Sequence, residues 1–413
     1  MKRSIKGIAL FFSGILVLSA ISTGQTITKE EIMGSMVLVN KYFMEKHPEP
    51  GENNCQRALY FEGLLALNKI NPVDSCLNYA LRWGEFHGWD LPSGTDPYDP
   101  ENLCCGQPYL DLYMLNRYRE ERIRNTRNRI DSILAGDKID EWKNTCELQM
   151  AMPVFAQLGS IHDNDRYFER MHEIYLYVKE KHAGNGLYSP EDHLWWFDKD
   201  FVPPYKEPNG ENCYWARGNG WVIAALVRSM DHMTKNSSIR KEYENTLKEM
   251  FEAIIPLQRE DGFWNVSLKD PSNFGGKEIT GTALFVYGMA WGMNEEIISK
   301  KDYMPVVLKA WNAIINDALH PDGSLGYVQG ESKGPKDGQP VGFDASSGNS
   351  DLVAGCFLLA GSEVYELIRS MEPKEKVKKE KDPEKKEKTG NRDKGDKGPK
   401  GDKGPKGDKG SKG

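Results

Sequence analysis

Residues 303–315 read YMPVVLKAWNAII, and this short stretch carries the pattern that decides the fold. Its apolar side chains recur at the i, i+3, i+4 and i+7 positions, which lie on one face of an α-helix. They are Val306, Val307, Ala310, Trp311, Ile314 and Ile315. Residues 222–230 repeat the pattern, whereas strand-like alternation is scarce in the chain. The sequence therefore predicts an all-α protein.

Twelve stretches with this helical pattern follow one another along the chain. The predicted helices lie near 30–46, 55–69, 73–88, 103–117, 119–134, 140–158, 163–182, 217–235, 239–258, 279–295, 302–317 and 350–368. Short turns alternate with long loops, so we expect six hairpins that close into a double ring of helices, the six-hairpin (α/α)6 barrel. An open helical-repeat solenoid is the alternative, with a more uniform repeat and shorter loops.

The two ends of the chain differ in composition from the body at 25–371. Residues 1–24 hold three basic residues, an apolar run and then small residues. This order predicts a signal peptide and a secreted, periplasmic protein without stable membrane insertion after cleavage; an uncleaved anchor is the alternative. Residues 372–394 are rich in Lys and Glu, as in a disordered linker. Residues 395–413 have glycine at every third position, as collagen does, but six triplets are few for a triple helix, so an oligomer through this tail is not expected.

The net charge of −7 conceals an acidic body, because both ends are basic. Residues 25–371 carry 35 Lys and Arg against 51 Asp and Glu, a net charge of −16. Such a surface repels phosphates, so no nucleic acid partner is expected. The seven cysteines are scattered, with no C-x-x-C pair and no Cys/His cluster at zinc spacing. We therefore expect free thiols, and no disulfide framework, metal or cofactor.

Four long loops share a composition rich in Gly, Pro, Trp, Tyr, Asp and Asn, at 89–101, 185–217, 261–280 and 320–350. Loops this long are uncommon in compact domains and are usually functional. Aromatic rings stack on the C–H faces of sugars, while carboxylates and amides bind sugar hydroxyls. Trp195, Trp215 and Trp221 lie in or beside these loops. The sequence thus favours a carbohydrate ligand, with ordinary core packing as the alternative for each tryptophan.

Residues 213–221, which read CYWARGNGW, form the most informative segment. Gly218 and Gly220 flank Asn219 where a predicted helix begins, so we expect that a ligand approaches the backbone closely there. Arg217 is suited to bind a substrate carboxylate, and a structural ion pair with a neighbouring acid is the alternative.

This segment belongs to an ordered set of motifs that spans the body. Gly186-Leu-Tyr and Asp192-His-Leu-Trp195 precede it, and residues 258–264 (QREDGFW) and 278–283 (EITGTA) follow it. Together they resemble the unsaturated glycuronyl hydrolases. More specifically, they resemble glycoside hydrolase family 105, the unsaturated rhamnogalacturonyl hydrolases, to which family 88 is related.

The resemblance implies an (α/α)6 barrel that removes a 4,5-unsaturated uronate from the non-reducing end of oligosaccharides. An acid protonates C4 of the double bond while water adds at C5, and the resulting hemiketal opens and releases the remaining sugar. By position, the resemblance assigns Arg217 to the substrate, Trp215 and Trp221 to the aromatic walls, and His193 to the active site. Trp195 is a further expected substrate contact.

The chain departs from the family pattern at the catalytic acid. Residues 142–154 read WKNTCELQMAMPV, and anchoring on Met-Ala and Pro-Val places Cys146 where the family has its Asp. Glu147 follows, but one step along a helix turns a side chain away by about 100°. Glu101 and Asn102 occupy a second acidic position, and Asn102 is an expected substrate contact. Three hypotheses stay open: a hydrolase that uses Glu147 or Glu101, a slow enzyme that uses Cys146, and a homologue that binds sugar without turnover.

Overall fold

The computed structural model describes residues 27–92, 98–330, 334–337, 341–344 and 350–372. The predicted signal peptide at 1–24 and the predicted collagen-like tail at 395–413 lie outside these residues, as does the linker at 372–394 apart from its first residue. Within the described ranges, no helix combines the length and the apolar character needed to cross a membrane.

Twelve α-helices form in the described residues, as the apolar spacing predicts. They are α1 (Lys29–Lys46), α2 (Cys55–Ile70), α3 (Asp74–Phe86), α4 (Gly106–Leu115), α5 (Arg124–Ala135), α6 (Thr145–His162), α7 (Asp165–Glu180), α8 (Ala216–Met230), α9 (Ser238–Ile254), α10 (Ile279–Asn294), α11 (Lys300–Ala313) and α12 (Ser350–Met371). A 3-10 turn, η1 (Pro100–Asn102), precedes α4. Capping side chains fix where several helices begin: Thr28, Asn54, Asn144 and Ser237 accept first-turn backbone N–H groups of α1, α2, α6 and α9.

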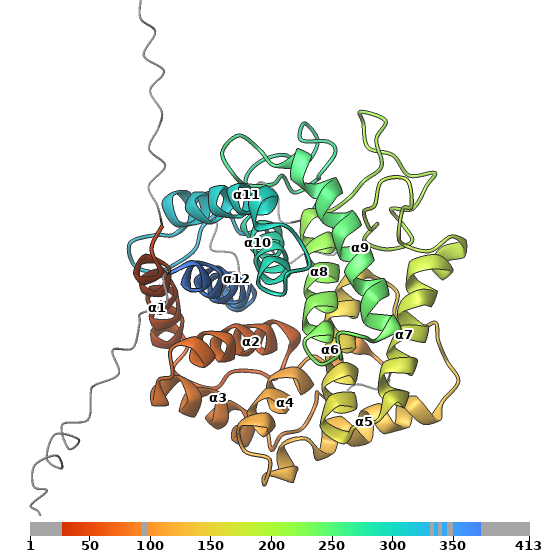
Figure 1. Ribbon diagram of the computed structural model, residues 1–413, viewed down its shortest axis with the longest axis vertical. Helices are drawn as coiled ribbons and strands as arrows, with labels where there is room; N and C mark the ends of the chain where they lie inside the picture. The colour runs from red at the N-terminus through yellow and green to blue at the C-terminus, as the bar shows by residue number, and fades with distance from the viewer. Residues whose placement is uncertain (1–26, 93–97, 331–333, 338–340, 345–349, 373–413) are drawn as a thin grey trace, which may run out of the picture. The chain divides into compact units, whose positions relative to one another are not determined.

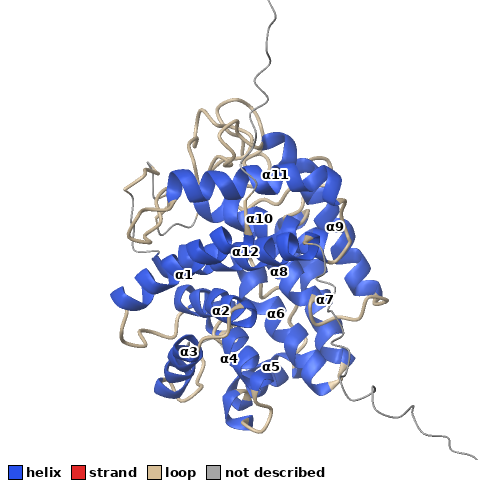
Figure 2. Cartoon of the chain, turned by 60° about the vertical axis from the view of Figure 1, so that its left-hand side comes forward, coloured by secondary structure: helices blue, strands red, loops and turns tan. Residues whose placement is uncertain are grey.

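The even-numbered helices form a closed inner ring (Figures 1 and 2). Each of α2, α4, α6, α8, α10 and α12 contacts the next in this order, and α12 contacts α2. The odd-numbered helices lie outside: α3 packs on α2, α7 on α6, α9 on α8, α11 on α10, and α1 on α12. Because α12 returns to α2, the ring closes. The predicted (α/α)6 barrel is confirmed, and the open solenoid is wrong.

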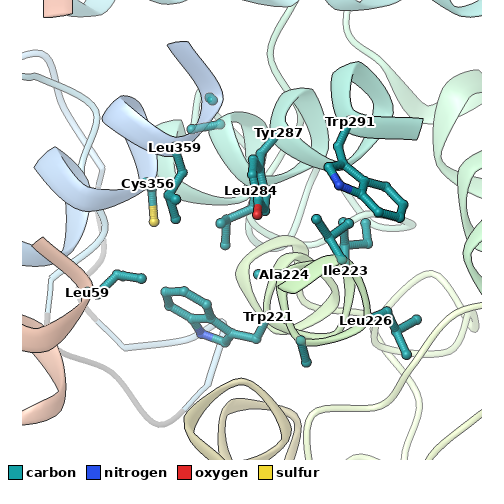
Figure 3. Close-up of a cluster of buried hydrophobic side chains, with 14 of the residues drawn as sticks. Leu59, Trp221, Ile223, Ala224, Leu226, Leu284, Tyr287, Trp291, Cys356 and Leu359 are labelled. Carbon is teal, nitrogen blue, oxygen red and sulfur yellow. The ribbon is translucent and has the colours of Figure 1, made fainter. Parts of the chain in front are cut away.

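Apolar side chains fill the space between the inner helices. Residues 279–293 of α10 are buried throughout, as expected for a helix that is surrounded by other helices. Figure 3 shows side chains of α2, α8, α10 and α12 meeting in one cluster, in which Leu59 and Trp221 point toward one another. Gly63 and Gly355 let α2 and α12 approach closely, because a Cβ at Gly355 would lie 2.3 Å from the Leu59 carbonyl oxygen.

A buried ionic cluster links three helices of the ring. Arg228 of α8 lies 3.3 Å from Glu62 of α2 and 3.1 Å from Asp111 of α4, and its Nε donates to Gln107. The Glu62 side chain has no exposed surface. Buried charges are tolerated only when they are paired and hydrogen-bonded, so these contacts fix how the three helices face one another.

Arg228→Met is therefore expected to destabilise the protein by about 3–5 kcal/mol, because it leaves the buried Glu62 carboxylate without its cation. The exposed pair Lys41–Glu45 provides the matched control: Lys41→Met should change stability by about 0–1 kcal/mol. Urea unfolding followed by circular dichroism measures both. Equal small losses would contradict a structural role for the buried cluster.

Candidate active site

A cavity of about 650 Å³ lies at one end of the barrel, where inner helices begin. The first turns of α2, α6, α8 and α12 contribute to its wall, together with η1 and the loops before α6 and α8. Its lining comprises Cys55, Gln56, Leu59, Glu101, Asn144, Cys146, Glu147, Gln149, Met150, Phe197, Asp198, Trp215, Arg217, Trp221, Asp337 and Leu352. Five of the eight predicted site residues therefore meet in one place.

The helix ends contribute an electrostatic effect of their own. Each helix carries about half a positive charge at its N-terminus, and several such ends face the same cavity. Helix N-termini are suited to bind anionic groups. Four carboxyl side chains in the described lining oppose this effect, and Arg217 is the single Lys or Arg there, so an anionic ligand depends on Arg217 and the helix ends.

Arg217, the second residue of α8, is held in place on several sides. Its Nε donates to the Thr280 hydroxyl at 2.9 Å, and its Nη2 donates to the Gln329 carbonyl oxygen at 2.5 Å. The carboxylate of Glu278 lies 3.7 Å from Nη2 and has no exposed surface. Glu278 itself accepts backbone N–H groups from the start of α10. The guanidinium is thus fixed in direction, and the ion pair predicted as its alternative role is present beside the cavity.

Two tryptophans give the cavity its aromatic surface. Trp215 and Trp221 both line it, and the Trp215 indole N–H donates to Gln329 Oε1 at 2.8 Å. The Arg217 guanidinium lies 5.4 Å from the centre of the Trp215 ring. A cation held against an indole face and a second indole nearby form a surface suited to a flat, anionic sugar ring.

Cys146 and Glu147 both line the cavity. They are the second and third residues of α6, and Gln149 and Met150 of the next turn line the cavity too, so the cavity covers a broad face of the start of this helix. The expectation that a 100° turn takes Glu147 away from the site is therefore wrong, because the cavity is wide enough to border side chains that lie 100° apart on the helix. The two candidates for the acid lie next to one another in the same space.

The protonation of these two groups differs. Burial raises the pKa of the Cys146 thiol well above its usual range, although the nearby Arg217 lowers it. Burial also raises the pKa of Glu147, to about 7, while a hydrogen bond from the backbone N–H of Lys143 opposes the shift. The Asn144 amide donates to the other oxygen of Glu147 at 2.6 Å. A carboxyl group with a pKa near neutrality both gives and takes protons readily, whereas this thiol holds its proton.

His193 lies outside the cavity. Its ring contacts the Tyr188 hydroxyl at 3.1 Å and lies 3.7 Å from the carboxylate of Glu249 on α9. The residue has a positive φ of 53°, part of the turn that ends at Trp195. The resemblance assigns His193 to the active site, but the structure does not bring it to this cavity, because this turn directs its ring toward Tyr188 and Glu249.

Trp195 is part of the core. Its side chain has no exposed surface, and its ring packs against Tyr175 and Tyr188. Asn219 binds the Trp195 backbone N–H and carbonyl, and also donates to the Trp215 carbonyl. The expected substrate contact at Trp195 is therefore wrong, and core packing, its alternative, is correct.

The glycines around Asn219 also serve packing. A Cβ at Gly220 would lie 2.8 Å from Leu284 of α10, and one at Gly218 would lie 3.1 Å from the Thr145 hydroxyl oxygen. These glycines bring helices close together, so the expected approach of a ligand to this backbone does not explain them.

Asn102 is buried and lines a neighbouring second cavity, together with Glu101. Glu101 also lines the first cavity, so this acidic position lies between the two cavities.

Sequence reasoning missed Gln56, Asp198 and Asp337 in the first cavity. Asp198 follows the Trp195 motif, and burial raises its pKa. The only sequence feature that could have identified Asp198 as a site residue is its place within a long polar loop.

The model of Glycosyl Hydrolase Family 88 matches residues 35–368, which include every helix that lines the cavity. The chain belongs to this family. The predicted resemblance to unsaturated glycuronyl hydrolases is therefore confirmed at the level of the family.

Several relatives of this family 88 chain are close enough to compare. It is 34% identical to the unsaturated 3S-rhamnoglycuronyl hydrolase of Formosa agariphila over 243 residues, 57% of this chain and 61% of that one. The chain thus spans about three-fifths of that relative. A solved family 88 glycosyl hydrolase from Bacteroides vulgatus has a TM-score of 0.77 and 27% identity, covering 83% of this chain and 100% of its own. A solved chain named as a polysaccharide lyase has a TM-score of 0.78 and 29% identity, covering 84% and 99%.

The cysteines of this family 88 chain allow a direct test of the thiol environment. All seven are free, and burial raises the pKa of Cys146 and Cys55, the two in the cavity, the latter to about 12. At pH 8 an ordinary thiol is about one-quarter thiolate. The native protein should therefore react with Ellman's reagent at less than about one-hundredth of the rate of the unfolded chain. Rapid labelling of one thiol that disappears in Cys146→Ser would contradict this environment.

Proposed function

We propose that the protein is an exported glycoside hydrolase of the unsaturated glycuronyl type, which removes a 4,5-unsaturated uronate from the non-reducing end of an oligosaccharide. The observation that carries the proposal is one cavity that holds a fixed arginine, two indole rings and a carboxyl group with a pKa of about 7. These are the carboxylate partner, the aromatic walls and the acid that the reaction requires. Family membership and the name of the Formosa agariphila relative support the same chemistry.

In the proposed reaction Arg217 binds the carboxylate of the unsaturated sugar, and the indoles of Trp215 and Trp221 pack against its ring. Protonated Glu147 transfers its proton to C4 of the C4=C5 double bond. A water molecule adds at C5 and returns a proton to the Glu147 carboxylate, which restores the acid. The resulting hemiketal opens to a ketone, and the bond between C1 and the neighbouring sugar then breaks by loss of that sugar. Net consumption is one water molecule.

Glu147 is favoured over Cys146 because of proton affinity. A group that protonates carbon and then accepts a proton from water works best when its pKa lies near the working pH. Glu147 meets this condition, whereas the thiolate that Cys146 would form on giving its proton is strongly disfavoured by burial. Glu101 lines the same cavity from η1 and is the other acid that the sequence suggests. We assign it to the rim, because it also borders the neighbouring cavity.

A sugar-binding homologue without turnover is the second candidate. The cysteine at the position of the family's Asp is the observation that favours it. Calorimetric binding of an unsaturated disaccharide, with no product formed over hours, would support this candidate. The collagen-like residues 395–413 would then serve as a tether. Size-exclusion chromatography tests this role by comparing the elution volume of the full chain with that of a chain ending at Ile368.

Ultraviolet absorbance tests the reaction directly. Purified protein is mixed with unsaturated galacturonyl-rhamnose and with unsaturated glucuronyl-rhamnose, and the absorbance of the conjugated double bond is followed. A hydrolase removes the double bond, so the absorbance falls. A lyase creates such bonds, so absorbance would rise with a saturated polysaccharide as substrate. No fall with either disaccharide rejects the proposed hydrolase.

Glu147→Gln is expected to lower kcat by about 10²–10⁴-fold, because the amide retains the shape of the side chain but has no acidic proton. Cys146→Ser is the matched control at the adjacent position, and we expect less than about a tenfold change. Cys146→Asp distinguishes the alternatives: a gain of more than tenfold would mean that the native cysteine is a defect and that Glu147 is not the acid.

The pH dependence of kcat/KM should reflect the titration of Glu147. The protonated form is active and its pKa is about 7, so kcat/KM is expected to be constant below pH 6 and to fall as pH rises through 7. Initial rates from pH 5 to 9 at constant ionic strength measure this profile. A decline centred near pH 4.5 would exclude Glu147 as the acid.

The proposal also places the protein in the periplasm. The basic, apolar and small-residue order of 1–24 supports export. Amino-terminal sequencing of protein from a periplasmic extract tests this placement. A chain that begins near residue 23 or 25 is the expected result, and an intact Met1 in the membrane fraction would overturn it.

A further inference from the structure

Exposed apolar side chains gather at the end of the barrel that lies away from the cavity. Nine large apolar side chains are exposed in the described residues, and five of them lie at or just after the C-terminal ends of α2, α4 and α12. These five are Val73, Met114, Leu115, Tyr118 and Met371. The three helices are neighbours in the ring, because α12 contacts α2 and α2 contacts α4. The exposed apolar residues therefore concentrate in one sector of this end.

The exposure is greatest between α4 and the 3-10 turn η2 (Glu120–Arg122), which contacts both α4 and α5. Leu115 is 61% exposed and Tyr118 is 95% exposed, and Met114 precedes them. The turn between them is held by hydrogen bonds: the Tyr118 N–H donates to the Asn116 side chain at 3.2 Å, and the Asn116 N–H donates to the Tyr113 carbonyl. Single exposed apolar residues are common, but a group of them marks an interaction site.

The same stretch is strongly basic, although the body is acidic. Residues 114–129 hold six Arg and two Glu, a net charge of +4. Each of the two glutamates is paired with an arginine, at 3.4 Å for Glu121 and Arg119 and at 3.8 Å for Glu120 and Arg127. The acidic residues of this stretch are thus already neutralised, and the excess charge is positive.

Arg117 and Arg124 carry this excess. No carboxylate of the described residues lies within ion-pair distance of either side chain. Arg124 is exposed and is the first residue of α5, whose first turn holds no acidic residue. A helix N-terminus carries partial positive charge, so an acidic residue is normally favoured there. The cation and the helix end reinforce one another instead, which is unfavourable unless an anion lies nearby.

An anionic lipid bilayer matches this combination of side chains. Aliphatic side chains enter the boundary between headgroups and acyl chains, and tyrosine is enriched at that boundary. Arginines bind lipid phosphates. An anionic polysaccharide would satisfy the arginines equally well, but Leu115 and Met114 offer it no aromatic face on which to stack. Contact through this end of the barrel also leaves the cavity at the opposite end open to substrate.

We propose that Met114, Leu115 and Tyr118, together with Arg117 and Arg124, form a docking surface for an anionic lipid bilayer. The three apolar side chains enter the headgroup boundary, and the two arginines contact lipid phosphates. The protein then lies on the membrane surface with its cavity facing away from the lipid. This inference goes beyond the proposed reaction and does not depend on it.

Sedimentation with lipid vesicles tests the docking surface in the full chain. One set of vesicles holds equal parts of phosphatidylglycerol and phosphatidylcholine, and the other holds phosphatidylcholine alone. Leu115→Ser should lower the partition coefficient for the anionic vesicles by about tenfold, because an apolar side chain no longer enters the boundary. Arg124→Gln should lower it by about fivefold. This second loss should shrink as salt screens the charge and should be absent with phosphatidylcholine alone.

Two variants on α1 provide matched controls. Val37 is 41% exposed and the Lys41 side chain is 69% exposed, both away from the docking surface. Val37→Ser and Lys41→Gln remove the same kinds of group, and they should leave the partition coefficient unchanged. Residues 1–24 and 372–413 are identical in every variant, so their own affinity for lipid cancels in the ratios. Arg124→Gln should not lower the melting temperature, because it removes a cation from a helix N-terminus.

Hydrogen exchange locates the contact independently of the variants. Anionic vesicles should slow amide exchange in residues 113–124 by at least about threefold and leave residues 198–212, at the cavity end, unchanged. Unchanged exchange in 113–124, or equal partition of the native chain and both docking-surface variants, overturns the proposal. If these variants instead lose binding to soluble polygalacturonate alone, the surface binds polysaccharide and the lipid proposal is wrong. Hydrolysis of a soluble unsaturated disaccharide should be the same in all variants, so the two proposals fail separately.

Discussion

The common direction of the inner helices is the constraint on which the rest of this structure depends. Hairpins alternate an inner and an outer helix, so every inner helix runs the same way, and their first turns meet at one end of the ring. Backbone N–H groups and partial positive charges therefore gather there. This arrangement sets partial positive charges beside the carboxyl groups of the cavity, and it brings Arg217, Cys146 and Cys55 together although they lie far apart in the chain.

The same geometry explains how the acid is positioned. Because the cavity borders a broad face of the start of α6, two consecutive residues reach it, and a carboxyl group is present even though Cys146 replaces the expected one. Glu147 bonds to the start of its own helix through Asn144 and Lys143. These hydrogen bonds favour the carboxylate, whereas burial favours the neutral acid. Burial is the larger effect, and the result is a pKa near neutrality.

Helix periodicity was sufficient to predict the fold, because burial of one apolar face is a local property of the sequence. The cavity was predicted in part: Arg217, Trp215 and Trp221 come from one segment and keep their order on α8. His193 and Trp195 could not be placed, because the positive φ at His193 decides which side of the loop its ring faces. Such a turn depends on packing against α7 and α9, which periodicity does not describe.

The second cavity could not be predicted from the sequence either, because its residues come from three separate segments that only the closed ring brings together. The proposed reaction depends on Glu147 keeping its proton up to about pH 7. Carbon-13 NMR of protein labelled at the glutamate carboxyl carbons measures this directly, with Glu147→Gln assigning the signal. We expect a titration midpoint near pH 7 for that signal. A midpoint near pH 4.5, the value of an ordinary glutamate, would contradict it.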